Sequence, residues 1–154
     1  MYPVPDVLAY LAGAWRVERT VRDLASGSAG HFTGRTVFDP PAGPDGGGLL
    51  HHESGTFTWQ GTARPAERTL RFLPAQPDED GARGTARVHF ADGRFFHGLD
   101  LRSGHHIADH PCSADLYRGE FTAYAPGRWR SVWRVEGPAK DLLLTTEYTR
   151  ERDD

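Results

Sequence analysis

The sequence predicts an all-β fold, an antiparallel up-and-down β-barrel of eight to nine strands with a short N-terminal helix. Most of the 154 residues fall into short segments in which apolar and polar side chains alternate, the period of a half-buried strand. Turns that use many of the 18 glycines and 11 prolines separate these segments. No crossover helices are indicated, so consecutive strands must close into a barrel or leave costly open edges.

Composition limits the classes of partner. A net charge of −3 with mixed signs argues against nucleic acid as a partner. No stretch approaches the roughly 18 apolar residues of a membrane span, and the first residues lack the basic region of a signal peptide. The single cysteine fits a reducing compartment. We expect a single barrel domain over residues 1–154, in the cytoplasm, with no nucleic acid and no membrane partner; a homodimer is left open.

The first segments predict a helix and then a strand. Asp6 is a suitable N-cap for a helix over residues 7–13, which Gly13 would end. From Trp15 to Val21 the chain alternates, and Arg19 interrupts an otherwise apolar face. Arg19 is therefore expected to point into the barrel.

Three more strands are predicted before the middle of the chain, at residues 31–38, 48–60 and 68–74. Both faces of the second of these mix apolar and polar residues. We assign inward the face that carries Leu49, Glu53 and Phe57.

A hairpin is predicted around Asp92-Gly93, because a two-residue turn of this type suits the twist of the flanking strands. This register pairs Phe90 with Phe95 and Val88 with His97, and Ala86 with Leu99 on the same face. His97 then lies on the apolar face, whereas Phe96 lies on the polar face.

The C-terminal part is predicted as a loop followed by three strands. Residues 103–114 (SGHHIADHPCSA) are expected to form a loop across the barrel mouth. Alternation in the first two strands places the following residues inward: Asp115, Tyr117 and Phe121, then Trp129, Ser131, Trp133 and Val135. In the last strand one phase carries Leu142, Leu144, Thr146, Tyr148 and Arg150.

The short helix followed by Gly13-x-Trp15 resembles the lipocalin signature, and Arg150 resembles the late arginine that packs across that tryptophan. The chain also resembles a bacterial lipocalin-like family of unknown function. The matching residues are Gly13-x-Trp15 with Arg19, Glu53-x-Gly55, Asp92-Gly93-Arg94-x-Phe96-His97, His110-x-Cys112 with Asp115-x-Tyr117, Trp129, Trp133, Gly137-Pro138-x-Lys140-Asp141 and Tyr148-x-Arg150. The resemblance implies a lipocalin-like, calycin-type barrel and no particular chemistry. Bilin lyases of photosynthetic bacteria share a similar barrel, but their motif residues are not found here.

The candidate site consists of polar side chains expected inside the barrel: Arg19, Glu53, His97, Asp115 and Tyr117. Buried charges need partners, so Arg19 should pair with Glu53 or Asp115. Such a set fits a purely structural network that plugs the barrel. It also fits a site for a small, partly apolar molecule with an anionic or hydrogen-bonding group, and this is our leading hypothesis. Its aromatic walls would be Phe121, Trp129 and Trp133.

An enzyme in the same cavity is the first alternative. Acid/base chemistry of the isomerase, cyclase or lyase type would use His97 or Asp115 as base and Tyr117 as acid. Metal or haem binding through His97 or His110 is the second, because His105, His106, Asp109, His110 and Cys112 have a metal-like composition. Their spacing matches no closed ligand set, so no metal site is assigned and the cofactor is left open.

Overall fold

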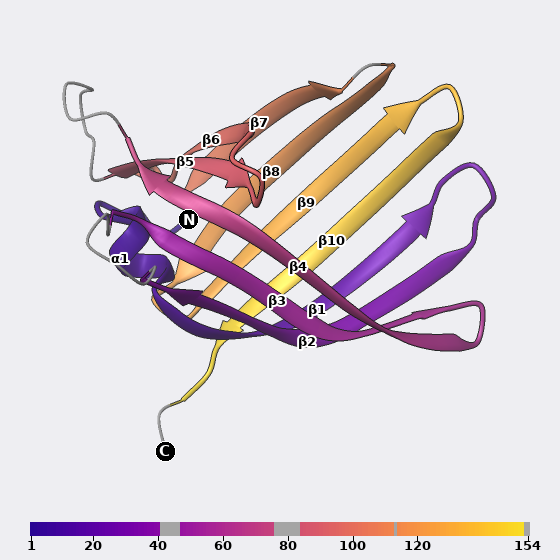
Figure 1. Cartoon of the computed structure of the whole chain (residues 1–154), viewed down its shortest axis with the longest axis horizontal. Coiled ribbons are helices and arrows are strands. Elements are labelled where there is room, and N and C mark those ends of the chain that lie inside the picture. The colour runs from indigo at the N-terminus through magenta and orange to yellow at the C-terminus, as the bar shows by residue number, and fades with distance from the viewer. Residues whose placement is uncertain (41–46, 76–83, 113, 153–154) are drawn as a thin grey trace.

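The computed structural model describes residues 1–40, 47–75, 84–112 and 114–152, and shows a nearly closed antiparallel barrel with one short helix (Figure 1). The elements are α1 (Val7–Leu11), β1 (Gly13–Asp23), β2 (Ala29–Asp39), β3 (Leu49–Trp59), β4 (Thr62–Pro74), β5 (Thr85–Phe90), β6 (Phe95–Asp100), β7 (His105–Cys112), β8 (Asp115–Ala125), β9 (Arg128–Gly137) and β10 (Lys140–Arg150). The predicted fold class is confirmed, with ten strands where eight or nine were expected.

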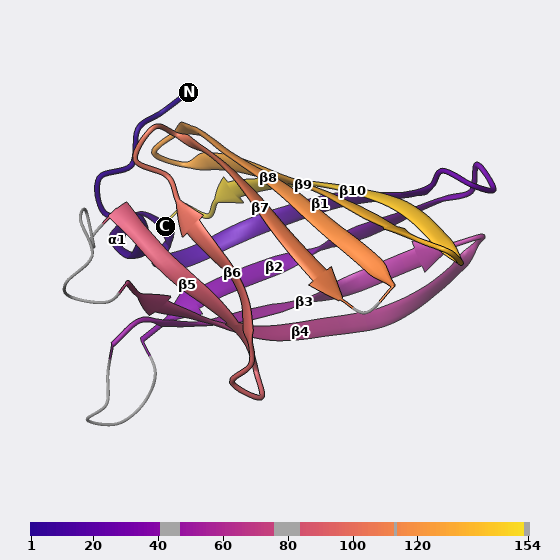
Figure 2. The ribbon, with the colours of Figure 1, turned by 90° about the horizontal axis from the view of Figure 1, so that it is seen from above.

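The strands form one sheet in the order β6-β5-β4-β3-β2-β1-β10-β9-β8-β7. The edge strands β6 and β7 lie side by side without a ladder between them (Figure 2). In the part of the chain that the structure describes, no helix is long and apolar enough to cross a membrane.

Helix α1 closes one end of the barrel, and the β1–β2, β3–β4 and β9–β10 hairpins turn at the other (Figure 1). Asp6 caps the helix as predicted, its carboxylate accepting a hydrogen bond from the Ala9 amide at 3.1 Å. The Arg150 guanidinium lies 4.1 Å from the ring centre of Trp15 and donates to the Ala12 carbonyl at 2.9 Å. The predicted packing of Arg150 across Trp15 is confirmed, and it ties the last strand to the end of the helix.

Burial decreases along the barrel from the helix end to the hairpin end. On β1, Trp15 and Val17 are buried, whereas Arg19 and Val21 are partly exposed. On β10, Thr146 and Tyr148 are buried and Leu144 is partly exposed. The helix end is therefore a packed apolar core, and the inward side chains near the hairpin end leave room for a cavity.

The register of the β5–β6 hairpin differs from the prediction in one place. Val88 pairs with His97 and Ala86 with Leu99 as predicted, but the register shifts beyond Val88, so that His89 and not Phe90 pairs with Phe95. This bulge makes Phe96 an extra residue that turns inward. Phe95 is 53% exposed and Phe96 only 9%, so the predicted positions of these two side chains were wrong.

The predicted loop across the barrel mouth is also wrong, because residues 105–112 form strand β7. The segment is polar because β7 is an edge strand with one partner, β8, and its proline lies where an edge strand tolerates one. Asp109 pairs in register with Arg118, and His105 lies 3.6 Å from Glu120. Strand β4 is likewise longer than predicted, beginning at Thr62 and not near residue 68.

Candidate functional site

A polar network spans the barrel where the packed core ends. Arg19 donates from Nη1 to Oε1 of Glu53 at 2.7 Å and from Nη2 to Oε2 at 3.1 Å, so the predicted Arg19–Glu53 pair is present and bidentate. Arg19 Nε donates to Thr146 Oγ1 at 2.8 Å, and Thr36 Oγ1 donates to Glu53 Oε2 at 2.9 Å. Both charged members are fixed by more than one partner, so the network holds one geometry.

Register explains how the strands assemble this network. Arg19 on β1 lies opposite Thr146 on β10, and Thr36 on β2 lies opposite Glu53 on β3. Cross-strand partners share a sheet face, so all four side chains point into the barrel.

The two charges of the pair stabilise each other in spite of burial. Burial alone would raise the pKa of Glu53, but the hydrogen bonds from Arg19 and the nearby charge of Arg68 lower it to about 2. Burial alone would lower the pKa of Arg19, yet its contacts with Tyr148 and Glu53 raise it above its ordinary value. Both groups are therefore charged at neutral pH.

Arg68 is a second guanidinium at the same carboxylate. It lies directly opposite Glu53 in the β3–β4 ladder, with Nη2 3.8 Å from Oε1 of Glu53. This distance is too long for a hydrogen bond. The Arg68 side chain is 46% exposed, whereas that of Arg19 is 12% exposed. Glu53 is held by two hydrogen bonds from Arg19, whereas Arg68 reaches it through this longer ion pair.

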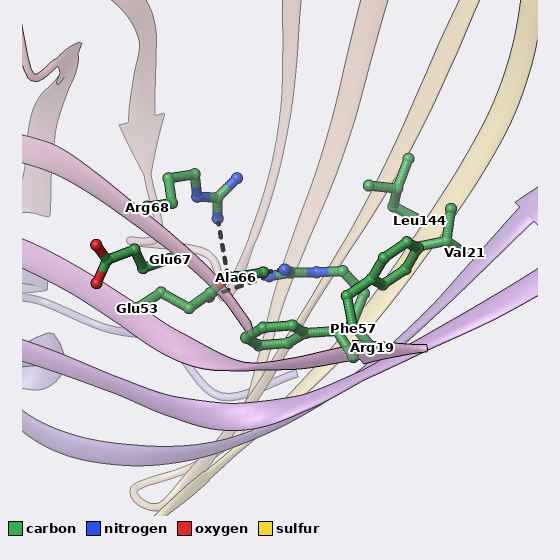
Figure 3. Close-up of a pocket in the computed structure, with 9 residues that line it drawn as sticks. Arg19, Val21, Glu53, Phe57, Ala66, Glu67, Arg68 and Leu144 are labelled. Atoms are coloured by element: carbon green, nitrogen blue, oxygen red, sulfur yellow. Dashed lines mark hydrogen bonds and ion pairs between the residues drawn. The ribbon is translucent and has the colours of Figure 1, made fainter. Parts of the chain in front are cut away.

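A cavity of about 290 Å³, here the first cavity, lies beside the two arginines. Figure 3 shows Arg19 and Arg68 both pointing toward Glu53, with Phe57, Val21 and Leu144 around them. The remaining lining residues are Phe32, Ala66 and Glu67. Glu67 turns its carboxylate away from the centre (Figure 3), and it lies 3.7 Å from His52. The first cavity thus combines apolar walls with a cationic side.

A smaller cavity of about 110 Å³, here the second cavity, adjoins the first. The two share Arg19, Arg68 and Leu144. The second cavity is bordered further by Phe96, Tyr117, Ser131, Trp133, Val135 and Thr146. Of the residues predicted for the site, Arg19, Glu53, Tyr117 and Trp133 therefore surround these two spaces.

His97 is buried in a cluster of rings and points inward, as predicted. Its ring centre lies 5.2 Å from that of Phe121 and 5.3 Å from that of Trp133. Nδ1 lies 2.7 Å from the Gly98 carbonyl oxygen, which can only accept, so Nδ1 carries the proton in the neutral ring. Burial lowers the pKa of His97 to about 4. The imidazole is therefore neutral at pH 7.

The other predicted site residues lie apart from this centre. Asp115 forms an ion pair with Lys140 at 3.2 Å. The contact requires a glycine at position 137, because a Cβ there would lie 1.8 Å from the Asp115 carboxylate. Trp129 stacks on Tyr148 at 3.7 Å within the core, and Phe121 is also buried there. The structure thus does not join His97, Asp115 and Tyr117 by direct contacts among its described residues.

The sequence interpretation missed Arg68, although a signal was present. Arg68 shares its strand phase with Leu70 and Phe72, both of which are buried. An arginine in that phase, like Arg19 on β1, indicates a charge that faces the interior. Tyr148 shares a strand phase with Thr146, but its position beside Arg19, with its hydroxyl 3.4 Å from Nη2, was not anticipated.

The histidine-rich segment does not gather into a ligand set. In the described ranges of the chain, no group of three or more His, Cys, Asp or Glu residues is placed to hold a metal ion. Instead, the ring of His110 packs against Phe96 at 5.2 Å and that of His106 against Phe121 at 6.4 Å.

Comparison with solved structures supports the fold. The S-type phycobiliprotein lyase CPES from Guillardia theta superimposes with a TM-score of 0.66 at 7% identity, over 96% of this chain and 92% of that one. A de novo designed fluorescence-activating β-barrel gives a TM-score of 0.48 at 14% identity, over 95% of this chain and 98% of that one. The redesigned β-barrel mFAP0, solved bound to DFHBI, gives a TM-score of 0.46 at 19% identity, over 92% of this chain and 99% of that one. At 7% identity the likeness to CPES concerns the fold alone.

Comparison of sequences identifies a family. None of the curated proteins matches this chain. The model of the DUF6314 family, described as a family of unknown function, matches residues 11–150, which include every strand of the barrel and the whole polar network. The chain therefore belongs to the DUF6314 family.

Proposed function

We propose that the barrel binds a small, partly apolar molecule with one anionic group, and that Arg68 is the residue that receives this group. The observation that carries the proposal is the charge balance beside the first cavity. One carboxylate, Glu53, faces two guanidinium groups, and Arg19 already satisfies it through two hydrogen bonds. The positive charge of Arg68 is left for an anion.

Glu67 also lines the first cavity, but its carboxylate turns away from the centre (Figure 3) and lies 3.7 Å from His52. His51 and His97 are inward histidines near this layer, and burial lowers their pKa values to about 3 and about 4. Both are neutral at pH 7. One monoanionic group would therefore balance the charge of Arg68, with Arg19 already paired to Glu53.

The apolar part of the ligand is proposed to fill the first cavity. Its walls are mainly aromatic and aliphatic, formed by Val21, Phe32, Phe57 and Leu144. A concave, mostly apolar space with a few placed polar groups is typical of small-molecule sites, and about 290 Å³ is at the lower end of their usual size. A planar guanidinium at its side favours a carboxylate, which it can bind through two parallel hydrogen bonds.

Native mass spectrometry of protein purified from its own host tests the proposal. We expect the intact protein to carry one organic anion per chain, and the Arg68→Gln variant to have lost it. Arg71→Gln is the matched control, because Arg71 is an exposed arginine of the same strand in the opposite phase. An empty wild-type barrel, or equal retention by the Arg68→Gln variant, contradicts the proposal.

A second candidate is acid/base catalysis in the same barrel, with His97 or Asp115 as base and Tyr117 as acid. The supporting observation is that the neutral His97 donates through Nδ1 to Gly98, which leaves Nε2 as a proton acceptor. His97→Ala and Tyr117→Phe should then abolish turnover of a substrate while the protein still folds. Unchanged turnover rejects these roles.

We also infer that the barrel is lipocalin-like, since Arg150 packs on Trp15 after a short helix. A cytoplasmic location, a bacterial source and a homodimer remain predictions from the sequence.

A further inference from the structure

The two cavities meet at three side chains, Arg19, Arg68 and Leu144. Arg19 is fixed by Glu53, Thr146 and the Phe32 ring, whose centre lies 5.1 Å from its guanidinium carbon. The ion pair of Arg68 with Glu53 is longer, at 3.8 Å. An anion bound to Arg68 would therefore stand at the junction of the two cavities and not at the far end of either.

The second cavity differs from the first in its walls. Phe96 and Trp133 stack with ring centres 5.2 Å apart at 22°, and Tyr117 lies nearby on β8. An engineered apolar cavity of about 150 Å³ accommodates benzene. The volume of the second cavity, about 110 Å³, is therefore of the order that one aromatic ring needs. Aromatic side chains favour an aromatic guest by offset stacking and edge contacts.

From this arrangement we infer that the two cavities form one bipartite site for a branched aromatic carboxylate. Its acid group binds Arg68 at the junction, its ring enters the second cavity and packs against the wall formed by Phe96, Tyr117 and Trp133, and its aliphatic chain occupies the first cavity. The inference rests on the proposed function and deepens it, because it specifies that the carboxylate lies between the two apolar parts of the ligand.

Two isomeric probes separate this inference from simple binding of an apolar anion. In 2-phenyloctanoate the carboxylate lies between the ring and the alkyl chain, whereas in 8-phenyloctanoate it lies at the end of the chain opposite the ring. The isomers share composition and charge, so their hydrophobic driving force is similar. Isothermal titration calorimetry should show 2-phenyloctanoate binding at least about tenfold more tightly, because one isomer alone places ring, chain and acid together.

Variants locate the ring. Val135→Phe fills the second cavity and should remove the preference, reducing the affinity for 2-phenyloctanoate to that for its isomer. Ala66→Phe narrows the first cavity and should weaken both isomers. Ser131→Val is a smaller change in the second cavity, for use if Val135→Phe fails to fold. Binding of 2-phenyloctanoate should change the tryptophan emission by altering the polarity around Trp133, and this change should be lost in Trp133→Phe.

The outcomes are distinguishable. Equal affinities of the isomers in the wild-type protein, both reduced in Arg68→Gln, would overturn the bipartite site and leave the proposed function standing. Failure of both isomers to bind, or binding that is insensitive to Arg68→Gln, would overturn the proposed function and the bipartite site together.

Discussion

Arg19 and Glu53 form a bidentate ion pair inside the barrel, with nitrogen-to-oxygen distances of 2.7 and 3.1 Å. They come from β1 and β3, so the contact spans β2 on the inner face of the sheet. The pair marks the level at which the packed core gives way to the cavities, and it determines the charge that a ligand would meet.

Removing the carboxylate should destabilise the protein. Glu53→Gln leaves the guanidinium of Arg19 in a largely buried position without its counter-charge, which typically costs about 3–5 kcal/mol. Urea unfolding of the variant measures this loss. Glu67→Gln is the control, since Glu67 on the adjacent strand is 74% exposed and its replacement should change the free energy of unfolding by less than about 0.5 kcal/mol. Similar stabilities of the two variants would show that the buried pair contributes little.

Stability should fall as the pH is lowered below 6.5. Burial lowers the pKa values of His51 and His97 to about 3 and about 4, from 6.5 for the unfolded chain. Between these values the unfolded state binds protons that the folded state does not, so the folded state is favoured at higher pH. The expected loss between a pH of about 7.5 and about 5 is ~2 kcal/mol for each histidine.

Urea unfolding at the two pH values measures this loss, and His97→Phe should reduce it by the share of one histidine. Glu53, whose pKa is lowered from 4.5 to about 2, adds a further loss as the pH falls below 4.5. Equal stability at the two pH values would mean that the two imidazoles can be protonated in the folded barrel.

Gly34 on β2 should not tolerate a side chain. A Cβ on Gly34 would lie 2.3 Å from the Ser54 carbonyl oxygen and 2.9 Å from the Gly55 Cα, both backbone atoms of the neighbouring strand. Gly34→Ala is therefore expected to cost at least about 1–3 kcal/mol, measured by thermal unfolding. Gly98→Ala is the control, because a Cβ there meets nothing within 4 Å. Equal melting temperatures for the two variants would contradict the close approach of β2 and β3.

Much of the fold could be predicted because alternation is a local property. The inward positions of Arg19 and His97 follow from strand phase, whereas Glu53 was assigned inward on a strand whose two faces are alike, and the structure agrees with each. Strand alternation no longer predicts which face a residue lies on where the ladder changes register. The bulge that turns Phe96 inward could therefore not be predicted from the sequence of the hairpin.

Partners across the barrel were harder to predict than phase. From the sequence, either Glu53 or Asp115 could be the ion-pair partner of Arg19. Which of them pairs with it depends on which strands are neighbours in the sheet. Asp115 instead reaches Lys140 over Gly137, a contact that requires the order β8-β9-β10 and a glycine at one register position. Strand β7 was missed because an edge strand buries little and so shows a weak apolar alternation.

The central claim is that Arg68 receives an anion beside an apolar cavity, and two fluorescent probes test it most directly. 1-Anilinonaphthalene-8-sulfonate carries a negative charge, and N-phenyl-1-naphthylamine is its uncharged counterpart. Loss of a charge-assisted contact typically costs about 1.5–3 kcal/mol, so Arg68→Gln should weaken the sulfonate at least about tenfold and leave the neutral probe within about twofold, with Arg71→Gln unchanged for both. Equal weakening of both probes, or of neither, by Arg68→Gln would contradict the claim.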